Sequence, residues 1–343
     1  MKVLVIFDVA RAVDPAEGIT IHALRHEEQK PMEADVISCL RALGHEVNRL
    51  AVYDDLPAMF ERIISFAPDV VFNMCETFYL DRAHEPNIPG LLDLMKVRYT
   101  GAGPDALLLC KDKALAKKIL AFHGVRVAGF VVSSRARPLR RLRRFRFPAF
   151  VKPLGEEGSN GISKASYARD EAEALERAAF IHKSFECDVL IEEYVVGREL
   201  TVGVLGNPRP LALPPRETFF GKADDDEMAP RFATQRSKWD DGYRRKWGIR
   251  NGAPDPLPAD VPERLAKTAR MAYRILKVRG LARLDVRLTE TGQIVVIEVN
   301  PNPSLAKTDD FAMAAASAGL TYEALIRRIL DNAVRGSTGK RPS

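Results

Sequence analysis

The sequence predicts a mixed α/β protein that is built from more than one domain. Residues 1–105 alternate strand and helix signals, and residues 281–300 alternate apolar and polar side chains as a β-hairpin does. The length of 343 residues indicates two or three domains, since a domain usually has about 100 to 200 residues. A content of 46% hydrophobic and 29% charged residues is typical of a globular protein.

The first part of the chain has the element order of a parallel sheet. Apolar side chains recur at helical spacing over residues 31–43 and stop at Gly44, a residue type that often follows a helix. Because parallel strands need crossover helices, this order predicts a parallel sheet. The polar segment 8–30 is expected to be a functional loop. The expected strands are 3–7, 46–52 and 69–73, and the expected helices are 31–43 and 56–66.

From residue 104 onward the strand and helix signals are less regular. Residues 214–258 are rich in Pro, Gly and charge, and we expect a long mobile loop over a site. The tail 334–343 is expected to be disordered. The expected helices are 106–122, 170–184, 262–277 and 321–333, and the expected strands are 125–132, 147–152, 189–195, 281–288 and 293–300.

The hairpin at 281–300 carries the sharpest chemical signal. In the expected register Asp285 faces Glu298 and Arg283 faces Asn300. Opposed carboxylates repel each other unless a cation lies between them, and Mg²⁺ takes carboxylate and phosphate oxygens as ligands. The hairpin therefore predicts a divalent metal site formed by Asp285, Glu298 and Asn300. The alternative is a solvated face on which Arg283 and Arg287 neutralise the acids.

A glycine-rich loop, residues 155–161, follows the strand that ends at Pro153. Its glycines are spaced by three, so backbone N–H groups could approach phosphate oxygens, with Ser159 and Asn160 as further donors. A plain flexible turn explains the same pattern. The loop does not match the Walker A motif, which occurs nowhere in the sequence.

Two other motifs have ordinary alternatives. Residues 101–106 match a relaxed dinucleotide fingerprint, which keeps a nicotinamide-dependent oxidoreductase as an alternative, but the strand before them is short and ends the sheet region. Residues 135–146 contain seven arginines. They could form a patch for nucleic acid or an acidic partner. Apolar residues three apart favour an amphipathic, solvated helix instead, so nucleic acid is not an expected partner.

Composition limits the compartment and the partners. The four cysteines lie far apart without a C-x-x-C pair, which favours reduced thiols over a zinc site or disulfides. No apolar run reaches the roughly 18 to 20 residues of a membrane span, and Asp8 and Arg11 interrupt any signal-peptide pattern. The net charge of +6 suits polyanionic small molecules. We expect a cytoplasmic protein that has no membrane partner.

Taken together, the motifs resemble the ATP-grasp superfamily, specifically D-alanine–D-alanine ligase and its relatives. The resemblance covers roughly residues 95–330, and more loosely the N-terminal part. It rests on segments that occur in the family's order: 99–103, 111–113, 151–153 with 157–159, 189–195, 197–202, 283–285 and 298–301.

The resemblance implies an ATP-grasp fold and a possible homodimer. The implied domains are an N-terminal pre-ATP-grasp domain with the parallel sheet (1–104), a central subdomain with the phosphate loop (105–188) and a C-terminal subdomain with the metal site (189–333). ATP and Mg²⁺ are the implied cofactors, and Mn²⁺ could replace Mg²⁺. The implied activity is a carboxylate–amine ligase that forms an acyl phosphate and acts on amino acids or small peptides. The alternative is a nucleotide-binding regulatory protein without catalysis.

The resemblance also implies roles for single residues. The implied phosphate contacts are Lys113, Lys152, Gly158, Ser159, Gly161 and Lys238, the adenine contacts are Glu192, Glu193 and Val195, and the ribose contact is Glu199. The implied metal ligands are again Asp285, Glu298 and Asn300, and the implied catalytic residues are Arg283, which would stabilise the oxyanion, with Ser159 and Lys238.

In the acceptor half the sequence departs from the family. The histidine-glycine motif of the N-terminal domain is replaced by residues 72–76. Trp239 stands where the family has a tyrosine after the loop lysine, and Ser304 stands where it has a glycine near the second substrate. Glu27 is the expected contact for the first amino group. Retained ATP motifs with altered acceptor motifs predict a ligase whose substrate need not be D-alanine.

Overall fold

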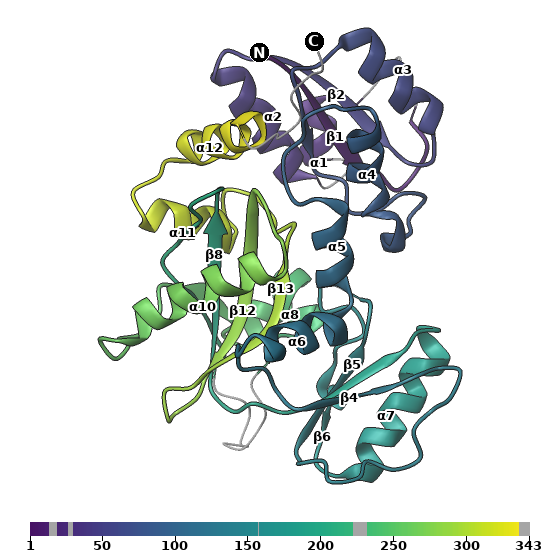
Figure 1. The fold of residues 1–343 in the computed structure, drawn as a ribbon, viewed down its shortest axis with the longest axis vertical. Helices are drawn as coiled ribbons and strands as arrows, with labels where there is room; N and C mark the ends of the chain where they lie inside the picture. Colours follow the sequence, from purple (N-terminus) through teal and green to yellow (C-terminus); the bar gives the residue numbers. More distant parts are fainter. Residues whose placement is uncertain (14–18, 27–29, 157, 222–231, 336–343) are drawn as a thin grey trace.

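The structure is a computed structural model that describes residues 1–13, 19–26, 30–156, 158–221 and 232–335. It contains three sheets with helices packed around them (Figure 1). The expected contact Glu27 and most of the tail expected to be disordered lie outside these residues. None of the helices in the described ranges is both long and apolar enough to span a bilayer.

The first sheet confirms the predicted parallel order. β1 is central and pairs in parallel with β2 and β3, and α2 and α3 form the crossovers. The segment 8–30, expected to be a loop, contains the short helix α1, and α4 was not anticipated. The elements are β1 (Lys2–Asp8), α1 (Ile21–His26), α2 (Pro31–Ala42), β2 (Glu46–Val52), α3 (Leu56–Phe66), β3 (Val70–Asn73) and α4 (Asn87–Leu94).

The second sheet is antiparallel and has α7 on one face. The single helix expected over 106–122 is wrong: it is two helices, because the Asp112 side chain accepts a hydrogen bond from Leu115 N at 2.8 Å and begins a new helix there. The elements are α5 (Pro104–Lys111), α6 (Lys113–Phe122), β4 (Phe130–Ser133), β5 (Ala149–Pro153), β6 (Tyr167–Ala168), α7 (Glu171–Ser184) and β7 (Val189–Glu193).

The third sheet contains the predicted hairpin, and its register is confirmed. Arg283 lies opposite Asn300 and Asp285 opposite Glu298, with an irregularity in the register after Asp285. Helix α10 packs on this sheet with its buried apolar side chains. The elements are β8 (Arg198–Leu205), β9 (Leu211–Ala212), β10 (Arg216–Phe219), β11 (Arg250–Gly252), α10 (Val261–Ile275), β12 (Leu281–Leu288) and β13 (Ile294–Asn300).

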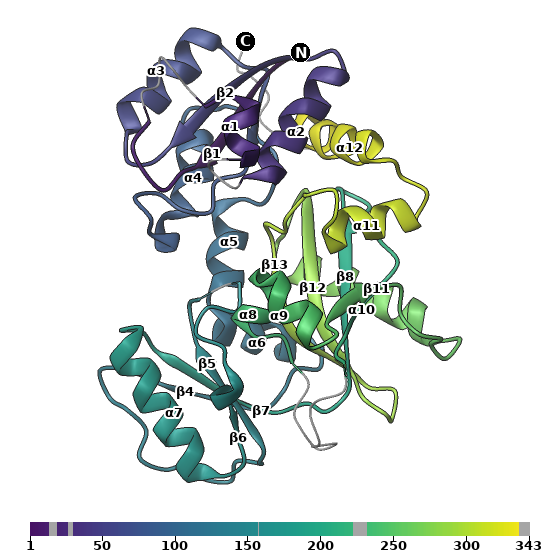
Figure 2. The same ribbon diagram turned by 180° about the vertical axis from the view of Figure 1, so that it is seen from behind.

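The expectation of one long loop over 214–258 is wrong for its described residues. They contain β10, β11 and two short helices, α8 (Gln235–Trp239) and α9 (Asp241–Lys246), which are visible in front of the sheet in Figure 2. Thr234 and Asp240 begin these helices by accepting hydrogen bonds from Ser237 N at 3.2 Å and Tyr243 N at 2.8 Å. Local caps and edge pairing thus give structure to a segment of loop-like composition.

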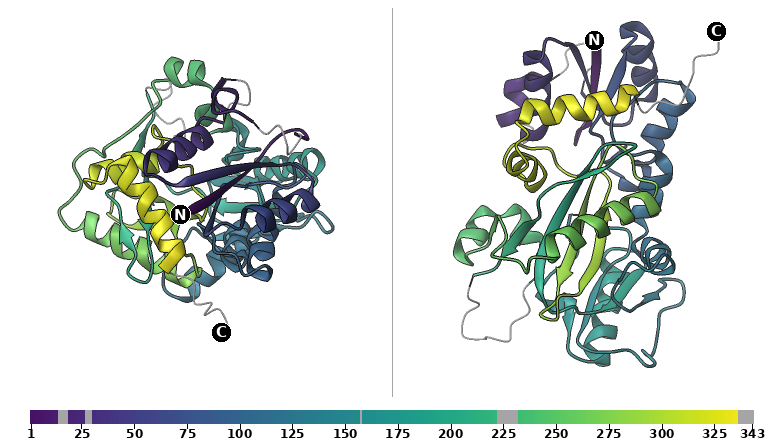
Figure 3. Two further views of the ribbon diagram at one scale, coloured as in Figure 1. Left: turned by 90° about the horizontal axis from the view of Figure 1, so that it is seen from above. Right: turned by 60° about the vertical axis from the view of Figure 1, so that its left-hand side comes forward.

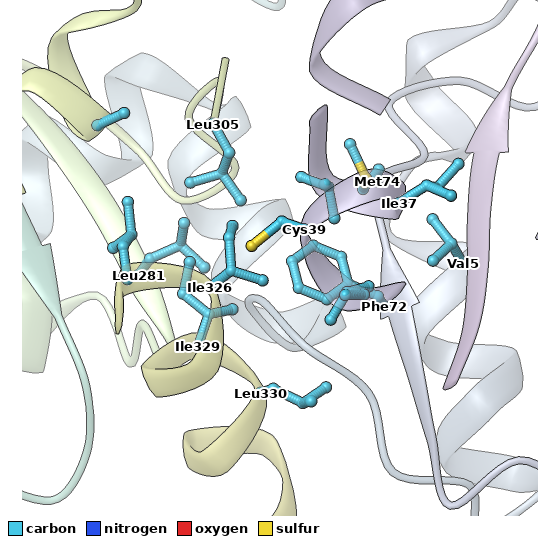
Figure 4. Close-up of a cluster of buried hydrophobic side chains, with 14 of the residues drawn as sticks. Val5, Ile37, Cys39, Phe72, Met74, Leu281, Leu305, Ile326, Ile329 and Leu330 are labelled. Atoms are coloured by element: carbon cyan, nitrogen blue, oxygen red, sulfur yellow. The ribbon is translucent and has the colours of Figure 1, made fainter. Parts of the chain in front are cut away.

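The C-terminal helices return to the N-terminal sheet. α11 (Asp310–Ser317) leads to α12 (Tyr322–Arg335), which packs against α2 and β3 (Figure 3). Ile326 and Leu330 of α12 share one buried cluster with Val5 and Phe72 of the sheet (Figure 4). This packing brings the C-terminal helix into the core of the N-terminal sheet. The limits of the domains stay a prediction.

The helix expected over 135–146 is wrong, since this arginine segment has turns and no helix. The buried Leu142 and the half-buried Leu139 face the core of the second sheet. Their backbone N–H groups donate to Glu171 Oε1 and Ser133 Oγ, both at 3.1 Å, and not to helical carbonyls. Pro138 has no N–H to donate, which also disfavours a helix interior there.

Candidate active site

A cleft lies between the second and third sheets and brings together nine of the residues predicted for ATP and metal binding. Its empty volume, which includes space open to solvent, is about 660 Å³. Strands β5, β7, β8, β12 and β13 supply most of its walls, and the glycine-rich loop, α8 and residues 194–195 and 232–233 contribute further side chains. The nine predicted residues are Lys152, Ser159, Glu192, Glu193, Val195, Glu199, Lys238, Asp285 and Glu298.

A second, more polar cavity adjoins the cleft and shares Lys238 and Glu298 with it. Its empty volume, open to solvent, is about 1590 Å³. The predicted residues that line it are Lys113, Gly158, Lys238, Arg283, Glu298, Asn300 and Ser304. The point where the two cavities meet is therefore the place where a group could pass from one ligand to another.

A buried triad of charges forms one wall of the cleft. Glu192 accepts an ion pair from Lys152 at 2.6 Å and from Lys117 at 3.0 Å, and all three side chains are buried. Burial lowers the pKa of Lys117, whereas for Lys152 the neighbouring Glu192 and Glu298 outweigh burial and raise the pKa. Sequence reasoning missed Lys117, although it lies four residues after Lys113 on α6, where both point to one side.

Glu298 lies in a strongly positive environment at the junction. Burial raises the pKa of its carboxyl group, but Lys113, Lys238 and Lys152 outweigh burial and lower the pKa to about 2. The carboxylate is therefore charged at neutral pH. The surrounding lysines create a field that favours phosphate groups as well.

Arg283 and Asp285 form a bidentate ion pair on β12. Arg283 Nε and Nη2 lie 2.7 and 2.9 Å from the two oxygens of Asp285. Although burial lowers the pKa of the guanidinium, Asp285 and Glu298 raise it further, so Arg283 keeps its charge. This contact agrees with part of the alternative interpretation, in which the arginine neutralises the acid, and it holds Arg283 facing the second cavity.

The residues predicted as metal ligands form a set of oxygen donors. Asp285 and Glu298 offer carboxylates, and the amide oxygen of Asn300 is held by Asn302 N at 2.8 Å. The described residues contain no group of three His, Cys, Asp or Glu suited to a metal. Two carboxylates and one amide oxygen beside the predicted phosphate contacts nevertheless fit Mg²⁺, which keeps several waters and takes few protein ligands.

The far end of the cleft is suited to a nucleobase. The rings of Phe150 and Phe232 pack edge to face with their centroids 4.9 Å apart, and the ring centroid of Tyr194 lies 6.2 Å from that of Phe150. Glu193 and Val195 flank this aromatic group. Sequence reasoning missed the aromatic residues because a phenylalanine in a strand is usually a core residue.

Glu199, which the family resemblance assigns to the ribose, also lines the cleft. Its carboxylate accepts a hydrogen bond from Arg287 Nη2 at 2.6 Å. Burial raises the pKa of Glu199, and this effect outweighs the neighbouring Arg287, which lowers the pKa. Arg287 also donates to Gly197 O at 2.9 Å, which fixes the orientation of the pair.

Three residues of the glycine-rich loop adopt left-handed backbone conformations. Gly158, Ser159 and Gly161 have positive φ values of 62°, 64° and 72°. At Gly161 a Cβ atom would lie 2.6 Å from Pro153 Cγ, so only glycine fits. Lys113 Nζ donates to the backbone oxygen of Glu156, which ties α6 to the loop.

The predicted substrate contacts are only partly placed. Ser304 lines the second cavity, and its hydroxyl lies 3.5 Å from Met32 Sδ. Trp239 ends α8, but its side chain is outside what the structure describes. Unanticipated residues of this cavity include Glu76 and Arg82, which pair at 2.8 Å.

The dinucleotide-like motif at 101–106 has a packing role. A Cβ atom on Gly280 would come within 3.2 Å of Gly101 N, so these backbones touch where β12 begins. The cleft with the predicted phosphate and adenine contacts lies elsewhere, between the second and third sheets. No observation supports the nicotinamide alternative.

Two sheets around a lysine-rich cleft, with a carboxylate-bearing hairpin at one end, agree with the ATP-grasp fold that the motifs imply. A family model described as D-ala D-ala ligase C-terminus matches residues 113–331. The chain therefore belongs to the D-alanine–D-alanine ligase-like family of ATP-grasp ligases.

Individual relatives agree with this assignment. A D-alanine–D-alanine ligase of Chlorobaculum parvum is 31% identical over 289 residues, which cover 80% of this chain and 71% of that protein. An uncharacterised protein of Sinorhizobium fredii is 29% identical over 309 residues, which cover 88% of this chain and 86% of that protein. The crystal structure of D-alanine–D-alanine ligase from Bacillus anthracis complexed with ATP has a TM-score of 0.72 at 20% identity, over 98% of both chains, which confirms the fold.

Proposed function

We propose that this protein is an ATP- and Mg²⁺-dependent ligase that joins a carboxylate to an amine through an acyl phosphate. The observation that carries this proposal is the junction of the two cavities, where Lys238, Arg283 and Glu298 meet. The first cavity would hold ATP, with the base near Phe150 and the phosphates near Lys152. The second would hold the substrates.

The charges at the junction suit both steps of such a reaction. In the first step a substrate carboxylate oxygen attacks the γ-phosphorus, the bond to ADP breaks, and negative charge spreads over the transferring group. Lys113, Lys152 and Lys238 would stabilise that charge from fixed positions. Bound Mg²⁺, held by Asp285, Glu298 and Asn300, would neutralise phosphate oxygens.

In the second step an amine attacks the activated carbonyl carbon, the bond to phosphate breaks, and the amine loses a proton. The carbonyl oxygen carries negative charge in the tetrahedral intermediate. Arg283 faces the second cavity and keeps its charge, so it is the expected oxyanion contact. The glycine-rich loop with Ser159 would shield the acyl phosphate from water.

We further propose that the acceptor site takes a larger or more polar amine than D-alanine. The second cavity is wide and charged, with Arg82, Asp241 and Arg244 on its walls. Arg244 donates to Ser237 O at 2.5 Å and to Asn251 Oδ1 at 2.8 Å, which holds this wall in place. Amino acids with polar side chains or small peptides suit such a site. The expected location stays the cytoplasm.

The test is phosphate release from ATP-Mg²⁺ over a panel of D- and L-amino acids and dipeptides. Wild type is compared with Arg283→Ala and Glu298→Gln, and with Arg264→Ala as a surface control, since Arg264 pairs with Asp260 and the hairpin turn and with no other described residue. Stimulation that both site variants lose and the control keeps would support the ligase. Stimulation only by D-alanine would contradict the altered acceptor, and tight ATP binding without stimulation by any member would favour the non-catalytic alternative.

A further inference from the structure

The arginine segment, residues 135–146, is a surface that the proposed reaction does not use. It contains seven arginines and no lysine or acidic residue. All seven arginine side chains are exposed. The expectation of a solvated helix, which discounted nucleic acid as a partner, does not hold for this segment.

Contacts with the core hold the arginine segment in one conformation. Leu142 is buried and Leu139 and Phe145 pack against the core of the second sheet, so the apolar side chains point inward. Hydrogen bonds from Leu139 N and Leu142 N to side chains of the core elements fix the backbone. The arginines between these anchors are therefore held facing solvent.

The arginine segment extends along the length of one helix. At one end Arg135 pairs with Glu186, just beyond the C-terminal end of α7, and at the other end Leu142 N is bound to Glu171, the first residue of α7. The segment therefore runs along α7, on the outer side of the second sheet (Figure 1). A 14-residue helix is about 20 Å long.

Most of this charge is unpaired. Arg135 has an ion pair, but Arg137 and the five arginines of residues 140–146 have none with a carboxylate of the described residues. Some surface arginines elsewhere have partners, as in Arg169–Glu173 and Arg264–Asp260, but few segments gather so many arginines. Adjacent like charges repel each other, and a bound polyanion would relieve that repulsion.

We propose that the arginine segment binds the phosphate backbone of a nucleic acid. The guanidinium group binds phosphate oxygens with two parallel hydrogen bonds, and the segment uses arginine exclusively. A row of charge about 20 Å long fits an extended polyanion better than a small anion. Its large apolar side chains, Leu139, Leu142 and Phe145, pack against the core, so it lacks the apolar centre of a protein interface and the insertion face of a membrane helix. Contacts to phosphate alone predict binding without sequence preference.

The experiment measures binding of the full chain to a fluorescent duplex of about 20 base pairs, longer than the arginine row at ~3.4 Å per base pair. A single strand, vesicles containing phosphatidylserine, and polyglutamate are the other probes. The variant Arg140→Ser/Arg141→Ser/Arg143→Ser is compared with Lys267→Ser/Arg274→Ser/Arg327→Ser, which removes the same charge from exposed positions on α10 and α12. ATP binding and thermal unfolding show whether each variant is folded.

The expected result is salt-dependent binding to the duplex or the single strand. The arginine variant should bind at least tenfold more weakly and reduce the slope of log K against log salt by about 2 to 3, since each phosphate contact contributes about 0.7 to 0.9. The charge-matched control should change affinity less than twofold. Equal losses in both variants, no loss in the arginine variant, or binding only to vesicles or polyglutamate would overturn the proposal.

Discussion

The cleft proposed to bind ATP (the nucleotide cleft) and the second cavity, proposed to bind the substrates (the acceptor cavity), are built from different kinds of structure. The cleft is lined mainly by strands of two sheets, whose backbone pairing fixes the positions of Lys152, Glu192 and Glu298. The acceptor cavity is lined by loops and short helices from distant parts of the chain, such as residues 76–82, 241–251 and 300–310. In the proposed reaction, strands would hold the phosphate contacts in place, while loops could change what is joined to the activated carboxylate.

The largest effect should come from the residue that links the two regions. Arg283→Ala should lower kcat by about 10² to 10³, since it removes a preorganised donor to the oxyanion. The KM for ATP should change much less. Steady-state phosphate release at saturating ATP measures both, and a loss confined to the KM for ATP would contradict the proposed role.

The second-largest effect should come from the buried charge triad in the wall of the nucleotide cleft. Lys117→Met should raise the KM for ATP about tenfold and lower the free energy of unfolding by about 1–3 kcal/mol, because Glu192 loses one of its two charged partners while it stays buried. Lys118→Met, at the exposed neighbouring position, is the control. Titration with ATP and chemical denaturation provide the two measurements. Identical behaviour of the two variants would refute the role of the triad.

The glycine-rich loop should show a smaller effect that is still specific to ATP. Gly161→Ala adds a clash with Pro153 to the cost of a positive φ, about 1–2 kcal/mol. Gly124→Ala has a similar φ of 77° and nothing within 4 Å, so it carries only the backbone cost. ATP affinity, measured by calorimetry, should fall in Gly161→Ala and not in Gly124→Ala.

The smallest effect should appear in the acceptor cavity and leave the nucleotide cleft untouched. Arg82→Gln removes the partner of Glu76 and should raise the KM of the acceptor amine several-fold. The KM for ATP should stay the same, as in the surface control Arg98→Gln. A fall in ATP affinity as well would contradict the expectation that the two regions act independently.

Local patterns predicted those parts of the site that neighbours in the sequence determine. The hairpin register followed from strict alternation, and it correctly placed Asp285 opposite Glu298. In contrast, the arginine segment had apolar residues at helical spacing, but tertiary contacts turned Leu142 into the core and left no helix.

The sequence by itself determined the elements and motifs whose geometry depends on near neighbours: the parallel sheet order, the hairpin, the glycine-rich loop and the family resemblance. Only the tertiary structure decided which charges meet, because side chains such as Lys117 and Glu192 come from separate elements. It also decided that α12 closes the N-terminal core and that six arginines face solvent without a described partner. Burial and long-range charge depend on contacts between distant segments, which no local pattern encodes.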